Sequence, residues 1–240
     1  MSGVLLESVD QGHWTLTLNR PDKRNALNDE LVLALSDALD RAHAAQASSL
    51  VLQGAGRSFC AGFDFSDFDT VSEGDLLLRF VRIELLLQKL YASPMATLAY
   101  AQGKNFGAGV DLFMSCQRRV AAPESTFRMP GLKFGLVLGT RRLGERIGQE
   151  AARNIQEVAA TVDVQEALKL GMANAVAAPE KLTQAIQGLR EAALALAPQT
   201  RADLYRVLGQ TESNEDLAQL VLSVVRPGVK DRIAAYRQGA

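Results

Sequence analysis

The chain has 240 residues, of which 48% are hydrophobic and 22% are charged, and its net charge is −1. This length suits one α/β domain with a short appendage, and the composition is that of an ordinary globular protein. The sequence carries no basic block for nucleic acid and no apolar stretch long enough to cross a bilayer, and its first residues lead us to expect no signal peptide. Two cysteines do not make a disulfide scaffold, so we expect a protein of the reducing cytoplasm without a nucleic-acid or membrane partner.

Strands and helices alternate in the first half of the chain. Residues 14–19 alternate apolar and polar side chains, which predicts a half-buried strand. Asn28 predicts the N-cap of a helix that runs to about Ala45, and residues 73–91 have the apolar spacing of an amphipathic helix. Short apolar runs predict two further buried strands, at 50–52 and 96–101.

Glycine-containing turns interrupt the middle of the chain, and helices dominate after Thr140. The elements predicted for this part are a short helix near Gly62, a turn over 103–109, a helix over 110–116, a strand over 119–122, a loop over 132–139 and a strand near 174–176. The pattern therefore predicts a strand-rich core followed by a mostly helical C-terminal part.

Two segments lead from a strand through a glycine-containing turn to the start of a helix, Gly54–Phe68 and Pro94–Cys116. The first N–H groups of a helix have no partner within the helix, so they can point at an anion or a polarised carbonyl. Two such junctions could supply two converging donors to the oxygen of a thioester enolate. The alternative for the first segment is a tight turn without a ligand.

Five motifs follow one another between residues 19 and 176. They are NRPDKRNAL at 19–27, SFCAGFD at 58–64, QGKNFGAGVDL at 102–112, FRMPGLKFGLVLG at 127–139 and LKLGMANAV at 168–176. In this order and at these spacings they resemble the enoyl-CoA hydratase/isomerase (crotonase) family. The resemblance implies an acyl-CoA thioester as ligand, with coenzyme A as part of the substrate, and no metal or separate cofactor.

The resemblance also implies an α/β fold. A crotonase-like superhelix of ββα units would form the core over residues 1–190, and a helical C-terminal region over residues 191–240 would serve trimerisation. Members of the family are usually homotrimers or dimers of trimers, and we expect the same here. The alternative for residues 191–240 is a simple continuation of the same domain.

A set of site residues follows from the same resemblance. The backbone N–H groups of Phe63 and Ala108 would form an oxyanion hole, although Ala108 stands where the family usually has glycine. The residues implied to bind the substrate are Lys23, Arg24, Ala26, Ala61, Gly62, Asp64, Phe65, Gly107, Pro130 and Gly131. For Lys23 and Arg24 the alternative is an ordinary surface charge.

The carboxylates of the site depart from the family pattern. Hydratases of the family use two glutamates, and the matching positions here are Asp111 and Gly131. Adding water to an enoyl thioester needs one group that activates water and another that delivers a proton. Gly131 can do neither, so the sequence predicts isomerase-like or atypical chemistry with Asp111 as acid and base. The alternative for Asp111 is a structural acid in the first turn of a helix.

Other functions stay open. Dienoyl-CoA isomerases resemble the chain at residues 109–112, but their further acids correspond to Gly131 and Gly139. A bound anion or water could replace the missing acid, as in naphthoate-synthase-like or thioester hydrolase chemistry. The remaining possibility is a non-catalytic acyl-CoA-binding or assembly subunit.

The remaining ionisable side chains are expected to be structural. Those expected as surface charges are Glu84, Asp67, Asp69, Arg128, Arg141 and Arg142. The alternative for the three acids is to replace the missing acid of the site, and the alternative for the three arginines is to bind a carboxylate of the acyl group or to shift a pKa. His13 and His43 are expected as surface or packing residues, because neither lies near another ligand or nucleophile in the sequence. Cys60 and Cys116 are expected in the core, without an activated thiolate.

Overall fold

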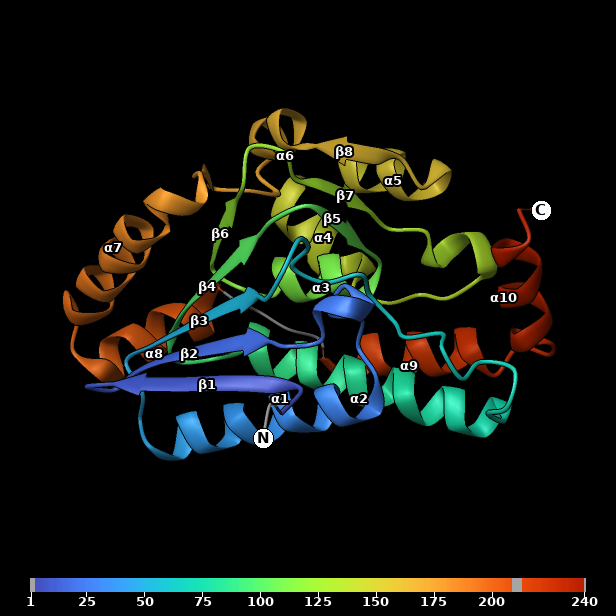
Figure 1. Ribbon diagram of the computed structural model, residues 1–240, viewed down its shortest axis with the longest axis horizontal. Helices are drawn as coiled ribbons and strands as arrows, with labels where there is room; N and C mark the ends of the chain where they lie inside the picture. Colours follow the sequence, from blue (N-terminus) through green and yellow to red (C-terminus); the bar gives the residue numbers. More distant parts are fainter. Residues whose placement is uncertain (1–2, 209–212, 240) are drawn as a thin grey trace.

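A six-stranded sheet forms the centre of the computed structural model, which describes residues 3–208 and 213–239 (Figure 1). In spatial order its strands are β1 (Leu5–Asp10), β2 (His13–Leu18), β3 (Ser49–Gly54), β4 (Ala96–Ala101), β6 (Arg118–Ala121) and β9 (Ala175–Val176). Strands β1 and β2 form an antiparallel hairpin, and every later pair in the sheet is parallel. The carboxyl ends of β2, β3 and β4 therefore lie at one edge of the sheet.

A second, smaller sheet has the order β5 (Lys104–Phe106), β7 (Thr126–Arg128) and β8 (Thr161–Asp163). Neither these three strands nor β1 are predicted by the sequence pattern. Three residues are too few to show the alternation that marks a strand. Most side chains of β1 are exposed because this strand lies at the edge of the large sheet.

Ten helices and three short 3-10 turns complete the described residues. The helices are α1 (Asp29–Ala44), α2 (Glu73–Tyr91), α3 (Ala108–Met114), α4 (Thr140–Ile147), α5 (Gln149–Val158), α6 (Val164–Leu170), α7 (Leu182–Leu194), α8 (Pro198–Leu208), α9 (Ser213–Val224) and α10 (Val229–Arg237). The 3-10 turns are η1 (Pro21–Lys23), η2 (Gly131–Phe134) and η3 (Pro179–Lys181). Within the described ranges, no helix combines the length and apolar character needed to cross a membrane.

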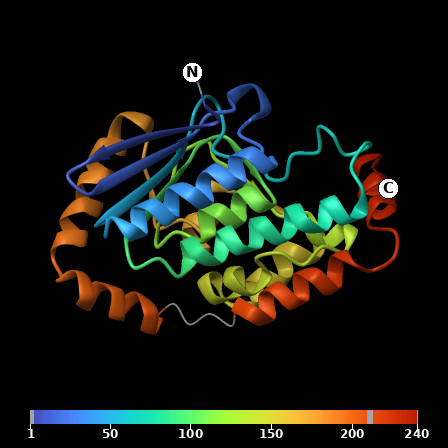
Figure 2. The same cartoon turned by 90° about the horizontal axis from the view of Figure 1, so that it is seen from below.

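Helices α1 and α2 begin where their capping residues predict. The side chain of Asn28 accepts a hydrogen bond from the N–H of Leu31, and Ser72 forms a reciprocal capping box with Asp75. The two helices run side by side (Figure 2). Their apolar faces join one core with the leucines of β2 and β3. Burial of each of these leucine side chains stabilises the folded state by about 2 kcal/mol.

The helix expected near Gly62 is absent, and this prediction was wrong. The backbone of this segment pairs instead with residue 27, since the N–H of Leu27 donates to the carbonyl of Gly62 and the N–H of Asp64 donates to the carbonyl of Leu27. This strand-like pairing uses the groups on either side of Phe63 and leaves its own N–H outside the pairing. Helix α3 also begins two residues earlier than expected, at Ala108, and the expected loop over 132–139 contains part of η2.

The C-terminal part is helical, as predicted, and α10 packs against η2. The rings of Phe134 and Tyr236 lie 5.2 Å apart between their centroids. In Figure 1, α10 lies at the right end of the molecule, beside η2. The division at residue 190 stays a prediction, and α7 runs across that position. Residues 1–2, 209–212 and 240, which belong to the two predicted regions, lie outside the described residues.

Candidate functional site

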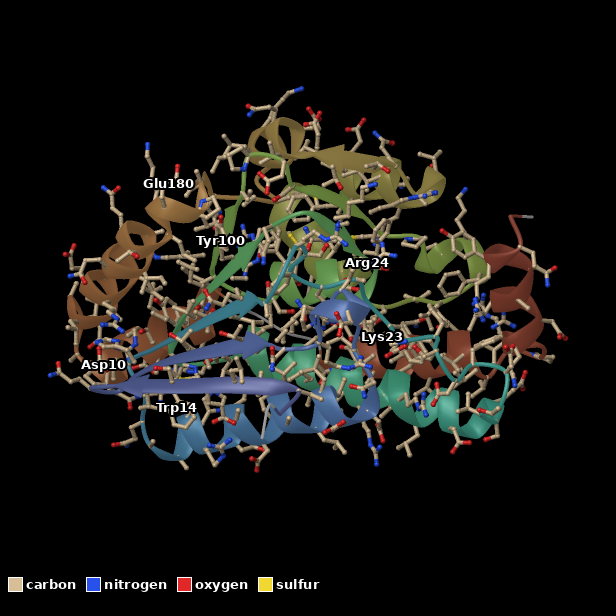
Figure 3. The ribbon with its side chains drawn as sticks, viewed as in Figure 1. Asp10, Trp14, Lys23, Arg24, Tyr100 and Glu180 are labelled. Atoms are coloured by element: carbon tan, nitrogen blue, oxygen red, sulfur yellow. The ribbon has the colours of Figure 1, made fainter. Side chains whose placement is uncertain are left out.

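The predicted site residues gather near the carboxyl ends of the parallel strands. Figure 3 places Lys23 and Arg24 on the turn after β2, whereas Asp10 and Trp14 lie toward the opposite end of that strand. Ligands of open α/β sheets commonly bind beyond the carboxyl ends of the strands. The turns after β2, β3 and β4 therefore meet where such a site is expected.

Close contact between two backbones brings the Phe63 and Ala108 amides to one place. Gly62 has φ of +84°, and a Cβ atom built on it would collide with the carbonyl oxygen of Phe106. The same Cβ would lie 3.4 Å from the amide nitrogen of Ala108. Only glycine allows this approach. Among the described residues, neither the N–H of Phe63 nor that of Ala108 donates a hydrogen bond to another part of the chain.

Both amides belong to residues that line a cavity of about 110 Å³, here called the aromatic cavity. Its aromatic residues are Phe63, Phe65, Phe80, Phe106, Phe134 and Tyr236. Gly62, Gly107, Pro130 and Gly131, which the resemblance implied as substrate-binding residues, line it as well. The cavity is therefore a mostly apolar chamber with two free N–H groups in its wall.

A second hollow of about 360 Å³, here called the basic hollow, shares Ala61, Phe63 and Phe65 with the aromatic cavity. The implied residues Lys23, Arg24, Ala26, Ala61, Asp64 and Phe65 all line it. Arg237 of α10 lines it too, and its guanidinium lies 5.7 Å from the ring centre of Phe65. Arg237 could not be predicted from the sequence, because only the fold brings the C-terminal helix to this place.

Asp64 is a buried part of the basic hollow. Its carboxylate lies 2.7 Å from Nη1 of Arg20 and also accepts hydrogen bonds from Ser66. Burial alone would raise the pKa of Asp64, but the hydrogen bonds from Ser66 and the pairing with Arg20 lower it. This carboxylate is therefore ionised and already engaged within the chain.

Asp111 is the only carboxylate among the described residues that line the aromatic cavity. Its position in the first turn of α3 leaves the residue 4% exposed. Burial raises the pKa of Asp111 well above its usual range, the Arg142 charge opposes this effect, and the Glu84 charge adds to it. An aspartate in this setting holds a proton to a higher pH than usual, so it can serve as both acid and base.

Glycines stand at the two positions where relatives carry further acids, Gly131 and Gly139, and neighbouring atoms lie close to both. A Cβ atom at Gly139 would collide with the carboxylate of Asp111. A Cβ atom at Gly131 would lie 3.2 Å from the carbonyl oxygen of Leu136. Gly139 therefore makes room for the shorter acid, while Gly131 supplies no carboxyl group to the cavity.

Glu84 and Arg142 were expected at the surface, and that prediction was wrong. They are only 1% and 3% exposed, and two hydrogen bonds of 2.8 and 2.6 Å join the Arg142 guanidinium to the Glu84 carboxylate. Glu84 lies on the buried face of α2, between Phe80 and Leu87. The sequence could not indicate that α4 would supply the matching cation. Both charges of this pair influence the pKa of Asp111.

The other charged residues expected at the surface differ in their exposure. Asp67 and Asp69 are exposed as predicted, and Asp67 pairs with Arg79 at 2.7 Å. Arg128 is half-buried and donates to the carbonyl of Ala159. Arg141 is half-buried as well and pairs with Asp216 of α9. The arginines that flank the altered acid segment therefore fasten it to neighbouring elements.

The histidines and cysteines occupy packing positions. His13 is hydrogen-bonded to Ser49, and His43 to Ser93. Burial raises the pKa of the Cys60 thiol to about 12, and that of Cys116 equally, so neither is an activated thiolate. Neither histidine and neither cysteine lines the aromatic cavity.

The enoyl-CoA hydratase/isomerase family model matches residues 9–221 of the chain. The chain therefore belongs to the enoyl-CoA hydratase/isomerase family, whose members are acyl-CoA enzymes. A crystal structure from Bordetella parapertussis, assigned to the same group, is 51% identical to it and covers 100% of both chains at a TM-score of 0.98. This agreement confirms the crotonase fold with its helical C-terminal region.

Two relatives of known sequence extend the comparison. The protein echA6 of Mycobacterium tuberculosis, named as an enoyl-CoA hydratase, is 38% identical over 166 residues. That match spans 68% of this chain and 66% of the mycobacterial protein. The 1,2-epoxyphenylacetyl-CoA isomerase of Escherichia coli is 30% identical over 248 residues, covering 100% of this chain and 94% of the relative.

Proposed function

We propose that the protein is an acyl-CoA isomerase that moves a carbon–carbon double bond by proton transfer through Asp111. One observation carries the proposal: Asp111 is the only carboxylate among the described residues that line the aromatic cavity. A double-bond shift needs one group that takes a proton and returns it at another carbon. Hydration needs two groups that act on water and on carbon separately.

The proposed reaction starts from a 3-enoyl thioester with its oxygen held by the N–H groups of Phe63 and Ala108. The Asp111 carboxylate takes a proton from C2, and the electron pair moves toward the thioester oxygen to give a dienolate. The same carboxyl then returns the proton to C4, so the double bond moves from C3–C4 to C2–C3. The two N–H groups stabilise the oxygen when its negative charge is largest.

The two adjoining hollows suggest how the thioester would lie. The basic hollow, with Lys23, Arg24 and Arg237, suits the phosphates of coenzyme A. The aromatic cavity suits the acyl group, because aromatic rings bury large apolar area. The name of the E. coli relative supports the choice of an isomerase acting on a CoA thioester.

A homotrimer or dimer of trimers is part of the same proposal. Large hydrophobic side chains of the C-terminal helices are exposed in the single chain, namely Leu204, Val207, Leu208, Leu222 and Val225. Exposed large hydrophobic side chains are common where protein chains pack together. Sedimentation analysis of the purified protein should give the mass of three or six chains, and a monomer would contradict this assembly.

The decisive experiment follows both the double bond and the exchange of protons. The wild-type protein should convert 3-hexenoyl-CoA into 2-hexenoyl-CoA, and in deuterated water it should exchange the C2 protons. Asp111→Asn should lower both rates by about 10²–10⁴-fold while it retains CoA thioester binding. Asp67→Asn is the matched control, because this exposed carboxylate lies outside the aromatic cavity.

Other outcomes would assign a different function. Addition of water to 2-hexenoyl-CoA at a rate above isomerisation would indicate hydration, and release of free CoA would indicate a hydrolase. Tight binding of acyl-CoAs with neither exchange nor turnover would indicate a binding or assembly subunit. Each of these results would overturn the isomerase proposal.

A further inference from the structure

Two polar groups beside the aromatic cavity have no partner within the described residues. Gln156 lies on the buried face of α5 and is 4% exposed, and its carboxamide makes no hydrogen bond to residues 3–208 or 213–239. The hydroxyl oxygen of Thr140, at the start of α4, is buried and unpaired over the same ranges. Buried polar groups in folded proteins are nearly always hydrogen-bonded. The fully buried hydroxyl of Thr140 and the barely exposed carboxamide of Gln156 therefore call for an explanation.

Both residues line the aromatic cavity, and both also line a third hollow of about 630 Å³, here called the rear hollow. The aromatic cavity shares Leu132, Thr140 and Gln156 with the rear hollow. It shares Ala61, Phe63 and Phe65 with the basic hollow, and the two sets have no member in common. An acyl group that enters from the basic hollow therefore meets Thr140 and Gln156 at a different wall.

The volume of the aromatic cavity restricts what can reach this wall. At about 110 Å³ it is somewhat smaller than an engineered protein cavity of about 150 Å³ that holds benzene. Beyond the thioester carbonyl group, a chain of roughly six or fewer carbon and oxygen atoms fits such a space. The other described residues that line the cavity are apolar, so Thr140 and Gln156 are the polar side chains available to such a group besides Asp111 and Tyr236.

We propose that Thr140 and Gln156 select a short acyl group that carries an acceptor oxygen, such as a ketone, at the end remote from the sulfur. The amide N–H₂ of Gln156 and the hydroxyl of Thr140 both donate hydrogen bonds, so together they match the two lone pairs of one carbonyl oxygen. The inference rests on the proposed use of the aromatic cavity as the acyl site. It adds the substrate class, a short oxygen-bearing acyl-CoA.

The selection explains why apolar analogues should bind less well. A thioester without the oxygen would leave two buried donors unpaired while it displaces any water that reaches them. A site built to bond an oxygen discriminates strongly against the analogue that lacks it. Gln156→Leu would remove the carboxamide and keep most of the side-chain volume, so it should weaken or reverse the preference.

Calorimetric titration with two CoA thioesters of matched shape tests the inference. 4-Oxopentanoyl-CoA and 4-methylpentanoyl-CoA differ by a carbonyl oxygen in place of a methyl branch, and both are saturated. The wild-type protein should bind the oxo compound about tenfold more tightly. In Gln156→Leu and in Thr140→Val the preference should fall to about twofold or less, or reverse.

A matched control lies on the same helix. Gln149 of α5 is exposed and lines the rear hollow but not the aromatic cavity, so Gln149→Leu should retain the wild-type preference. Equal binding of the two thioesters by the wild-type protein would overturn the inference, as would an unchanged preference in Gln156→Leu. Titration measures binding without turnover, so it tests the preference for the oxo compound separately from the isomerase activity. The preference can be absent in a protein that isomerises 3-hexenoyl-CoA, and it can be present in one that does not.

Discussion

A single carboxyl group in an apolar wall sets the chemistry at the residue scale. Asp111 takes up its proton at a higher pH than an exposed aspartate, mainly because burial disfavours the charged form. The proposed first step needs the carboxylate. We therefore expect kcat/KM for 3-hexenoyl-CoA to rise about tenfold per pH unit until the raised pKa is reached, and then to level off. A profile that is flat from pH 5 to 9 would contradict this role.

The same buried proton predicts an effect on stability. A raised pKa in the folded state means that wild-type stability falls as pH rises from about 4, the ordinary pKa of aspartate, to the raised value. Asp111→Asn removes this ionisation. Its unfolding free energy relative to wild type should therefore increase across that pH window, as urea denaturation at several pH values can measure. A gap that stays constant with pH would argue against a raised pKa.

At the scale of elements, the approach of two turns depends on one missing side chain. Gly62→Ala would combine a left-handed backbone with a collision against the Phe106 carbonyl. Gly12→Ala is the control, because Gly12 has a similar φ of +81° but no atom within 4 Å of its added Cβ. We expect Gly12→Ala to lose about 1 kcal/mol of stability and to bind acyl-CoA normally.

Gly62→Ala should lose about 1–3 kcal/mol more than the control, since the backbone must move to relieve the collision. That movement separates the Phe63 and Ala108 amides, so the C2 exchange rate should fall even under conditions in which the variant is fully folded. Circular dichroism and deuterium exchange at C2 measure the two effects. Normal exchange in a folded Gly62→Ala variant would contradict the role of this contact.

The buried ion pair of Glu84 in α2 and Arg142 in α4 connects the two helices. Among the described residues, Glu84→Gln leaves the buried Arg142 guanidinium with Asp216, at 3.5 Å, as its remaining ion-pair partner. Breaking a buried pair from one side costs about 3–5 kcal/mol, whereas an exposed pair is worth about 1 kcal/mol or less. Denaturant unfolding should show this contrast between Glu84→Gln and the exposed Asp67→Asn. Equal losses would mean that the Glu84 pair contributes no more than a surface pair.

At the scale of the whole molecule, the fold brings the two ends of the sequence to one hollow. Lys23 and Arg24 come from the turn after β2, and Arg237 comes from α10. We expect Arg237→Gln to weaken CoA binding several-fold at low salt, and the loss to shrink at high salt because ions screen exposed charges. Arg226→Gln is the control, since this exposed arginine does not line the basic hollow. Equal effects of the two variants would contradict a direct contact.

Much of the fold could be predicted from local patterns. The N-cap at Asn28, the helix over 73–91 and the strand over 96–101 all appear with the predicted bounds or within a residue. Their signals are local, because capping side chains and apolar spacing act within a few residues. The three-residue strands of the small sheet lack such a signal, and their pairing depends on distant parts of the chain.

Some residues of the candidate site could be predicted from the sequence, and others could not. The implied ligand residues could be placed from their motifs, and the structure brings them to two adjoining hollows. Gln156, Thr140 and Arg237 could not be found in advance, since a glutamine in a helix or an arginine near a C-terminus is usually a surface residue. Their surroundings are made by elements far away in the sequence.

The sequence by itself determined that the chain has the family motifs, a helical C-terminal part, and Asp111 with Gly131 at the acid positions. These features depend on residue identity and spacing alone. Only the tertiary structure decided that Glu84 and Arg142 are buried partners, that Gly139 leaves space for Asp111, and that two unpaired polar groups border the aromatic cavity. Burial and pairing arise when separate elements pack together, and no single segment carries that information.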